Sequence, residues 1–157
     1  MTLTDHTLDS GRRALLGFVA GFLATLVFHQ FTLLLLYVMN VSPFGAFPTA
    51  PTAPLGVPTV LSLAFWGGVW GVLYVFAHHR FPAGTGYWIA ALLFGGLLTS
   101  LVALFVVSPL QGGPIAAGGN VRVLLVVFLI NGAWGVGTGL FIDWLAAPFG
   151  ARSSTAA

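Results

Sequence analysis

The sequence predicts an all-helical membrane protein in which four transmembrane helices form a bundle. Five basic and three acidic residues are the only fixed charges among 157 residues, or 5%, where a soluble domain averages about 25%. No Asp, Glu, Lys or Arg occurs in residues 14–79, 81–121 or 123–142. Because a span needs about 20 apolar residues, each of these stretches is long enough to cross a membrane at least once.

Prolines and glycines divide these stretches into four predicted helices. A polar tail, residues 1–13, precedes them, and a second tail, residues 147–157, follows the transmembrane domain, residues 14–146. The pair Arg12-Arg13 faintly resembles a twin-arginine export signal, but the apolar run after it is longer than the 7–15 residues of a signal peptide. We therefore expect the first helix to remain as a span. The predicted helices are 14–38, 59–78, 87–108 and 123–146.

The two loops on the side opposite the termini are rich in proline and glycine. Residues 40–58 carry no charge and contain five prolines, which prevent a regular helix or a central strand. This loop either folds back over the bundle, where protein or trapped water must satisfy its carbonyls, or lies among the lipid headgroups. The sequence leaves both alternatives open for this loop and for residues 109–121.

The distribution of arginine predicts which side of the membrane the termini occupy. Arg12 and Arg13 precede the first helix, Arg80 follows the second, and Arg152 follows the fourth. The opposite side has only Arg122. Since basic residues near span ends stay on the cytoplasmic side, we expect both termini to be cytoplasmic.

Two similar helical hairpins follow one another in the chain. Val41–Pro43 after the first helix matches Val107–Pro109 after the third, at an offset of 66 residues. Gly68–Val72 in the second helix matches Gly132–Val136 in the fourth, at an offset of 64. Because each copy contains two spans, both copies would enter the membrane in the same direction, as a parallel repeat. A chance match in a chain rich in Gly, Val and Leu is the alternative.

Small residues recur every four positions in the predicted helices. Residues four apart share a helix face, and small side chains let helices approach closely in lipid, so these stripes predict the packing faces. In the first helix the stripe ends at His29, and in the fourth it ends at Asp143. The stripes are Gly17, Gly21, Thr25 and His29; Gly67 and Gly71; Gly95, Thr99 and Ala103, beside Gly96 and Ser100; and Asn131, Gly135, Gly139 and Asp143.

Polar side chains from all four helices fall at a similar depth, slightly outward of the helix midpoints. One interpretation is interhelical hydrogen bonding, which contributes about 0.6 kcal/mol per pair on average. The other is a pathway or binding site for a small solute or a proton. His29 would be its titrating member, because the ordinary pKa of histidine, about 6.5, is close to neutral. The layer contains His29, Gln30, Thr99, Ser100 and Asn131, with Trp66 as a secondary candidate.

Asp143 is a second, weaker candidate, because it is the only acidic residue outside the N-terminal tail. It lies near the cytoplasmic end of the fourth helix. There it either takes part in a proton relay or marks the membrane interface near Arg80.

The composition argues against several other functions. Five scattered arginines make no patch that could follow a nucleic-acid backbone, and the absence of cysteine excludes disulfides and thiolate metal sites. Adjacent His78 and His79 at a span end indicate the interface rather than a metal site. Bis-imidazole haem ligation needs two facing histidines, and only His29 is predicted within the membrane. We expect no cofactor, no metal and no enzymatic activity.

Several segments together resemble small uncharacterised integral membrane proteins of proteobacteria with four helices. They are the pair His29-Gln30, the proline-rich Pro51–Pro58, Leu61–Gly71 and Ile130–Gly135. The resemblance extends over most of the chain, from about residue 14 to residue 145. It implies a bacterial origin and placement in the cytoplasmic (inner) membrane, and it implies no activity.

Two functions are consistent with these observations. In the first, the chain forms a homo-oligomeric bundle that binds or passes a small solute or a proton at the layer around His29. In the second, it is an accessory or assembly subunit that packs against a larger membrane complex, and the polar layer serves only to join helices. Both functions place the chain in the lipid bilayer.

Overall fold

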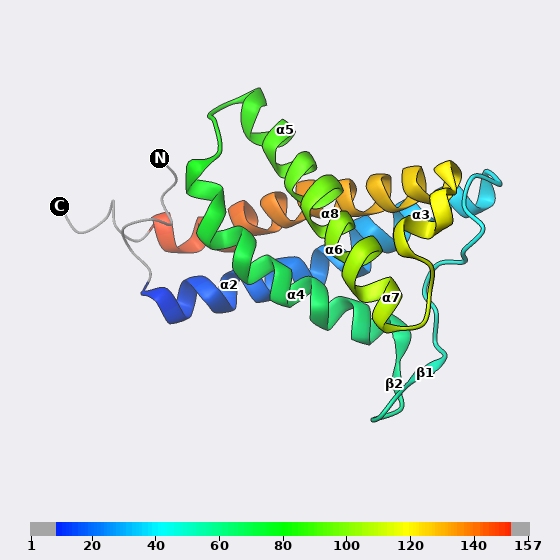
Figure 1. The fold of residues 1–157 in the computed structure, drawn as a ribbon. Coiled ribbons are helices and arrows are strands. Elements are labelled where there is room, and N and C mark those ends of the chain that lie inside the picture. The colour runs from blue at the N-terminus through cyan, green and yellow to red at the C-terminus, as the bar shows by residue number, and fades with distance from the viewer. Residues whose placement is uncertain (1–8, 152–157) are drawn as a thin grey trace.

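The computed structural model of the chain describes residues 9–151, with side chains as far as residue 147. Four helical spans pack into a bundle (Figure 1), and each is long and apolar enough to cross a membrane. The prediction of four such helices is confirmed. The tail as far as residue 8, and Arg152, lie outside the described residues. The spans are Ser10–Val38, Thr59–Arg80, Thr85–Leu110 and Val121–Ala147.

The first span begins earlier than the sequence predicts. Asp9 caps its N-terminus, because the carboxylate accepts a 2.9 Å hydrogen bond from the backbone N–H of Arg12. Arg12 and Arg13 therefore lie in the first helical turns and not in a polar tail. The span consists of α2 (Ser10–Ala24), the π-helical η1 (Thr25–His29) and α3 (Gln30–Val38).

The second and fourth spans are mostly continuous α-helix and lie close to their predicted ranges. The second consists of α4 (Thr59–Ala77) followed by the short 3-10 helix η2 (His78–Arg80). The fourth is α8 (Val121–Ala151), which follows a short turn, η5 (Ile115–Gly119). The start of α2, the element η2 and the end of α8 lie at the same end of the bundle (Figure 1).

The third span continues through Pro109, although the sequence predicts that the helix ends before this residue. Pro109 lies just after a π-helical turn, and Val107 and Ser108 before it keep right-handed helical φ and ψ angles, so the helix runs through this residue without the hydrogen bond that an N–H would donate. The first span, in contrast, ends at Val38, before Val41–Pro43. The third span consists of α5 (Thr85–Leu93), the π-helical η3 (Phe94–Thr99), α6 (Ser100–Val102), the π-helical η4 (Ala103–Val107) and α7 (Ser108–Leu110).

Glycines bring the first two spans into backbone contact. A Cβ atom added to Gly21 would collide with the backbone of Gly67, and one added to Gly71 would collide with the carbonyl oxygen of Gly17. The absence of side chains at these positions lets α2 and α4 make the most extensive contact between any two described elements. Close packing of this kind drives helix association in lipid.

The third and fourth spans also pack through glycines. A Cβ atom added to Gly95 would collide with the carbonyl oxygen of Asn131, and one added to Gly135 would collide with that of Ala91. Trp134 joins the two helix pairs, because its indole N–H donates a 3.0 Å hydrogen bond to the carbonyl of Gly21. α8 therefore contacts both α2 and α5.

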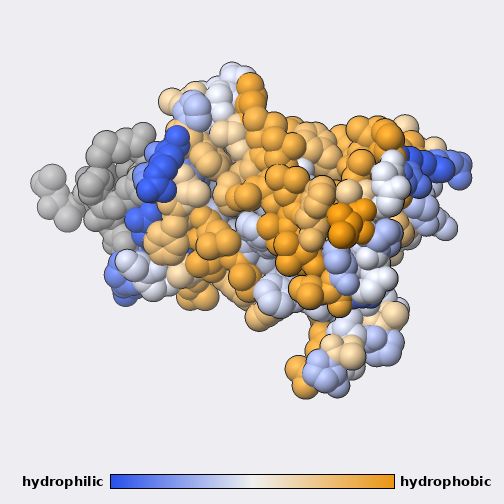
Figure 2. Space-filling view, in the orientation of Figure 1, coloured by the Kyte–Doolittle hydropathy of each residue, from blue (hydrophilic) through white to orange (hydrophobic). Residues whose placement is uncertain are grey.

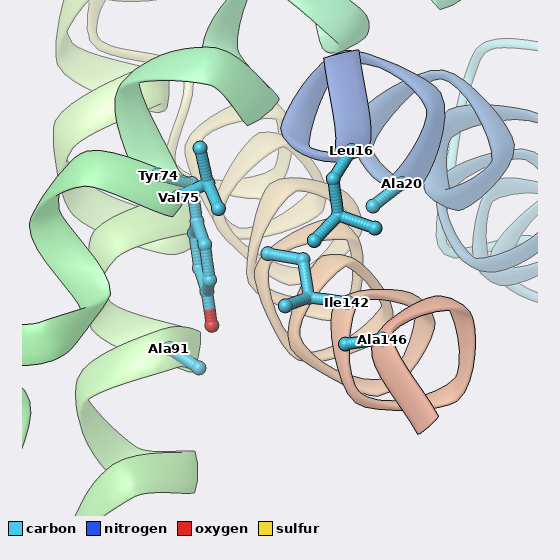
Figure 3. Packing of buried hydrophobic residues seen from close by; sticks show 7 residues of the cluster. All are labelled: Leu16, Ala20, Tyr74, Val75, Ala91, Ile142 and Ala146. Carbon is cyan, nitrogen blue, oxygen red and sulfur yellow. The ribbon is translucent and has the colours of Figure 1, made fainter. Parts of the chain in front are cut away.

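A hydrophobic core fills the bundle near the end at which α2 begins (Figure 3). Tyr74 is fully buried at its centre, and its ring meets the rings of Phe94 and Trp134 at centroid distances of 5.2 and 6.4 Å. The small residues around it let the four helices converge. The cluster contains Leu16, Ala20, Tyr74, Val75, Ala91, Ile142 and Ala146.

Apolar side chains cover the outside of the bundle. On the face shown in Figure 2, a broad hydrophobic band separates two ends that carry the hydrophilic residues. An exposed apolar area of this extent is typical of a surface that contacts a membrane. The described structure is therefore compatible with a multi-pass membrane protein.

The outer segment, residues 39–58, has two parts. Residues 41–47 fold back over the end of the bundle, where Val41 and Ala46 pack against a second core, formed by Leu33, Val126 and Ile130. The rest forms a small hairpin that projects sideways (Figure 1), in which β1 (Pro51–Thr52) pairs antiparallel with β2 (Val57–Pro58). Of the two alternatives left open by the sequence, folding back over the bundle describes the first part.

Arg122, at the start of α8, makes hydrogen bonds to the outer segment. Its Nε donates a 2.6 Å hydrogen bond to the carbonyl of Val41, and its Nη2 donates to the carbonyl of Asn40. The backbone N–H groups of Val41 and Ser42 in turn donate to the carbonyl of Leu36. Arg122 therefore stabilises the turn that ends the first span.

We expect Arg122→Gln to loosen this turn without unfolding the bundle. These hydrogen bonds are exposed to solvent, which reduces their contribution to about 0.5–1.5 kcal/mol, so hydrogen exchange at the amides of Val41 and Ser42 should rise several-fold. Exchange is measured by mass spectrometry on the full chain in detergent micelles. Arg80→Gln, at the opposite end, is the control and should leave these amides protected. Equal exchange in wild type and Arg122→Gln would show that the contact contributes nothing.

Candidate functional site

His29 and Gln30 lie at the junction between η1 and α3, beneath the outer segment. Gln30 is fully buried, whereas His29 is half-buried. The amide of Gln30 makes two contacts: its Oε1 accepts a 2.6 Å hydrogen bond from the backbone N–H of Phe47, and its Nε2 lies 3.4 Å from Nδ1 of His29. A hydrogen-bonded chain thus runs from the imidazole to the outer segment.

The contact with Phe47 determines how the amide and the imidazole are oriented. Because a backbone N–H only donates, the amide atom facing it must be the oxygen. The NH₂ group of Gln30 therefore faces His29 and donates to Nδ1. In neutral His29 the proton is then on Nε2, which makes Nε2 the donor that the imidazole offers to a ligand.

Phe47 is held in an unusual backbone conformation. Its φ angle is 52°, in the left-handed region that bulky residues rarely adopt. Its ring packs edge-on against Phe31, with a centroid distance of 5.5 Å. Because such strain persists only where the surroundings impose it, the contacts with Gln30 and Phe31 together position this residue.

Ser100 and Asn131 form a second polar group, between the third and fourth spans. Asn131 Nδ2 donates a 3.0 Å hydrogen bond to Ser100 Oγ, which donates at 3.3 Å to the carbonyl of Val127. The Thr99 hydroxyl donates to the carbonyl of Gly95 on its own helix. Within residues 9–147 no side-chain hydrogen bond connects this group to His29 or Gln30. The predicted layer is thus divided into two hydrogen-bonded groups.

The two secondary candidates lie elsewhere. Trp66 is 59% exposed on the outside of α4, where it packs edge-on against Phe65 at 5.7 Å. Asp143 is exposed near the end of α8 and interacts electrostatically with His78. Neither side chain joins His29 and Gln30.

A π-helical turn ends at each of the two polar groups, and nothing in the sequence predicts these turns. His29 ends η1, and Thr99 ends η3. In η1 the hydroxyl of Thr25 donates a 3.0 Å hydrogen bond to the carbonyl of Gly21, the same four-residue relation that Thr99 has with Gly95. π-helical turns inside α-helices are frequent at functional sites, which favours a functional interpretation of the histidine.

A further group of protonatable side chains lies at the opposite end of the bundle. Tyr74 and His78 are almost completely buried there, and Tyr87 and Asp143 approach them from α5 and α8. The four-residue spacing of Tyr74 and His78 was the available signal, since it places both on one helix face. Among the described residues no group of three His, Cys, Asp or Glu side chains could hold a metal ion.

Comparisons of the chain with protein-family models, with curated proteins and with solved structures found no match.

Proposed function

We propose that the chain is a small bacterial inner-membrane protein that binds a proton or a small polar solute at His29 and Gln30, and passes it as part of a homo-oligomer. The main support is the hydrogen-bonded chain from His29 through Gln30 to Phe47. An ionisable side chain within the membrane is costly, and such side chains usually line a binding site or pathway. Because the residue His29 is partly exposed in one chain, a second copy packed against it would complete its burial.

The proposed chemistry follows from the orientation of the imidazole. Neutral His29 offers Nε2–H, so a bound solute would present a hydrogen-bond acceptor to it. A proton would instead bind at Nδ1, and the NH₂ group of Gln30 would have to turn away, since two donors cannot face each other. Both events involve the same two side chains.

The proposed topology has both termini in the cytoplasm. The segments with Arg12, Arg13 and Arg80 share one end of the bundle, and Arg122 begins the helix at the other end (Figure 1). This asymmetry agrees with the rule that basic residues remain on the cytoplasmic side.

We also propose that the two hairpins are a parallel repeat. The close contact of Gly21 with Gly67 corresponds to that of Gly95 with Asn131. From Gly67 to Asn131 the offset is 131 − 67 = 64, as in the sequence match, whereas from Gly21 to Gly95 it is 95 − 21 = 74. If Ser42-Pro43 and Ser108-Pro109 are equivalent, the first hairpin has 42 − 21 = 21 residues from its glycine contact to this motif, and the second has 108 − 95 = 13. The first copy would then contain eight more residues in this part.

The experiment is a flux measurement on liposomes that contain the full chain, between about pH 5 and pH 8. We expect a proton or solute flux above that of empty liposomes, reduced about tenfold or more in His29→Ala, which corresponds to about 1.4 kcal/mol. His79→Gln is the matched control, because His79 is an exposed histidine at the other end of the bundle. Equal folding and equal protein density are established first.

An accessory or assembly subunit is the second candidate. The hydrogen bonds of Ser100 and Asn131 favour it, since they join the third and fourth spans within one chain and need no solute. Absence of flux from wild type and variant, together with a partner that co-purifies at fixed stoichiometry, would overturn the first proposal and support this one.

A further inference from the structure

The hairpin of β1 and β2 leaves the bundle at the outer end of the second span. β2 ends at Pro58 and α4 begins at Thr59, so no linker separates the hairpin from the span. Figure 1 shows the hairpin pointing across the long axis of the bundle. In a membrane that the spans cross along this axis, the hairpin runs parallel to the membrane surface.

The strands of the hairpin have no backbone N–H group directed away from it. The N–H of Thr59 donates to the carbonyl of Ala50 at 2.9 Å, so these two residues form a hydrogen-bonded pair. Opposite residues alternate in an antiparallel ladder, so the N–H groups of the next pair, Pro51 and Pro58, would point outward. Both residues are prolines and have no N–H. The strands therefore present carbonyl groups and no backbone donors to their surroundings.

The threonine hydroxyls of the hairpin are also used within it. Thr52 Oγ1 donates at 2.8 Å to the carbonyl of Val57, and Thr59 Oγ1 donates at 2.7 Å to the carbonyl of Ala50. The N–H of Gly56 closes the turn with a 2.7 Å hydrogen bond to the carbonyl of Thr52. Because these polar groups already have partners, it costs little to bring them close to an apolar phase.

The tip of the hairpin is apolar and uncharged. Leu55 is 84% exposed, the largest exposed fraction of any large apolar side chain among the residues with described side chains, 9–147. Residues 39–58 contain no Asp, Glu, Lys, Arg or His. A leucine that no part of its own chain covers is unfavourable in water and favourable at the boundary of the acyl chains.

The edges and the tip of the hairpin are poorly suited to a second protein chain. A strand that pairs with an edge needs donors as well as acceptors, and proline at an edge prevents such pairing. The tip, residues 53–56, has no aromatic residue and no arginine, the types enriched in protein interfaces. The acyl core is also unsuitable, because open strand edges with carbonyl groups do not occur there. The hydrated headgroup layer satisfies both the carbonyl groups and the leucine.

We propose that the hairpin lies in the headgroup layer of the membrane, with Leu55 at the boundary of the acyl chains. Its partner is the lipid surface at the outer end of the second span. Because the hairpin is uncharged, it contacts zwitterionic and anionic headgroups equally. The proposal rests on the placement of the spans in a membrane and is independent of the role of His29.

The test measures the depth of the hairpin tip with a fluorescent label. The chain has no cysteine, so a single introduced cysteine is its only thiol. Leu55→Cys is labelled in the full chain in phosphatidylcholine nanodiscs, whose two faces are both open to solvent. Iodide quenches from the water, and lipids brominated at a shallow or a deep position of the acyl chain quench from the membrane. The references are Ser10→Cys, at the exposed start of α2, and Leu97→Cys, 50% exposed in the middle of the third span.

We expect the shallow brominated lipid to quench the label at position 55 more strongly than the deep one. Iodide should quench it several-fold less than the label at position 10, and the deep lipid should quench the label at position 97. Replacing part of the phosphatidylcholine by phosphatidylglycerol should leave the result at position 55 unchanged. Because Leu55 is exposed, Leu55→Cys keeps the fold, which equal circular dichroism spectra check.

Three results would overturn the proposal. Quenching by iodide as strong at position 55 as at position 10 would place the hairpin in water. Protection of position 55 from both kinds of quencher would show that a protein, either a second copy or another subunit, covers it. Absence of lipid quenching at position 97 would remove the membrane placement on which the proposal rests. A failure of the solute site changes the flux in His29→Ala and none of these readings, so the two failures are distinguishable.

Discussion

Replacing Gly21 by valine is expected to separate the first two spans and to cost the bundle about 3 kcal/mol of stability or more. Any Cβ atom at this position would collide with the carbonyl oxygen of Gly67 and lie 2.9 Å from Cα of Gly71. Both are backbone atoms, so a whole helix must move to make room. The Gly21 carbonyl also accepts the indole N–H of Trp134 at 3.0 Å, so the displacement extends to α8. Unfolding of the full chain in mixed micelles, followed by circular dichroism, measures the loss.

A pair of glycines on α8 provides the matched comparison. An added Cβ atom at Gly135 would collide with the carbonyl oxygen of Ala91, whereas at Gly132 the nearest atom is a side-chain carbon of Leu92, at 3.4 Å. We expect Gly135→Ala to destabilise the bundle by about 1–3 kcal/mol. Gly132→Ala should be close to neutral, because the gain of about 1 kcal/mol in helix propensity offsets the cost of moving the Leu92 side chain slightly. Equal effects of the two substitutions would contradict the role assigned to backbone contact.

The number of spans could be predicted from the sequence because it depends on two strong signals. Charged side chains are costly in lipid, so the three uncharged stretches between Arg13 and Asp143 mark the membrane regions, and the prolines of residues 43–58 divide the first stretch into two spans. The path through Pro109 was not predictable in this way. A proline removes one helical hydrogen bond, and whether the helix continues in spite of this depends on the packing of the chain on both sides.

Part of the candidate site could be predicted: the sequence indicates His29 and Gln30, but it does not indicate Phe47, whose N–H Gln30 contacts. Phe47 is 17 residues from Gln30 and uses a left-handed conformation that no propensity favours for phenylalanine. The π-helical η1 could not be foreseen either, because an extra residue per turn changes which side chains face the neighbouring helices. The burial of His78 could not be predicted for a similar reason. The sequence places this histidine at a span end, and whether it faces the bundle depends on how each helix is rotated about its own axis.

Gln30→Leu is expected to release the outer segment from the bundle. Leucine fills a similar volume and removes both contacts of the amide, so the Phe47 N–H loses its 2.6 Å acceptor and His29 loses its neighbour. The hydrogen bond is partly buried, and losing a hydrogen bond costs about 0.5–1.5 kcal/mol, so hydrogen exchange at the Phe47 amide should rise several-fold. Because Phe47 adopts a strained φ of 52°, loss of its acceptor also lets the backbone relax.

Gln30→Glu separates the two contacts of the amide. A glutamate carboxyl keeps an oxygen for the Phe47 N–H in either protonation state, whereas it can donate to Nδ1 of His29 only when it is protonated. We therefore expect protection of the Phe47 amide to persist in Gln30→Glu and to be lost in Gln30→Leu. Gln111→Leu is the control, because Gln111 is an exposed glutamine after the third span. Equal exchange at Phe47 in wild type and Gln30→Leu would show that Gln30 does not hold the outer segment in place. His29 would then not be linked to the outer segment through Gln30.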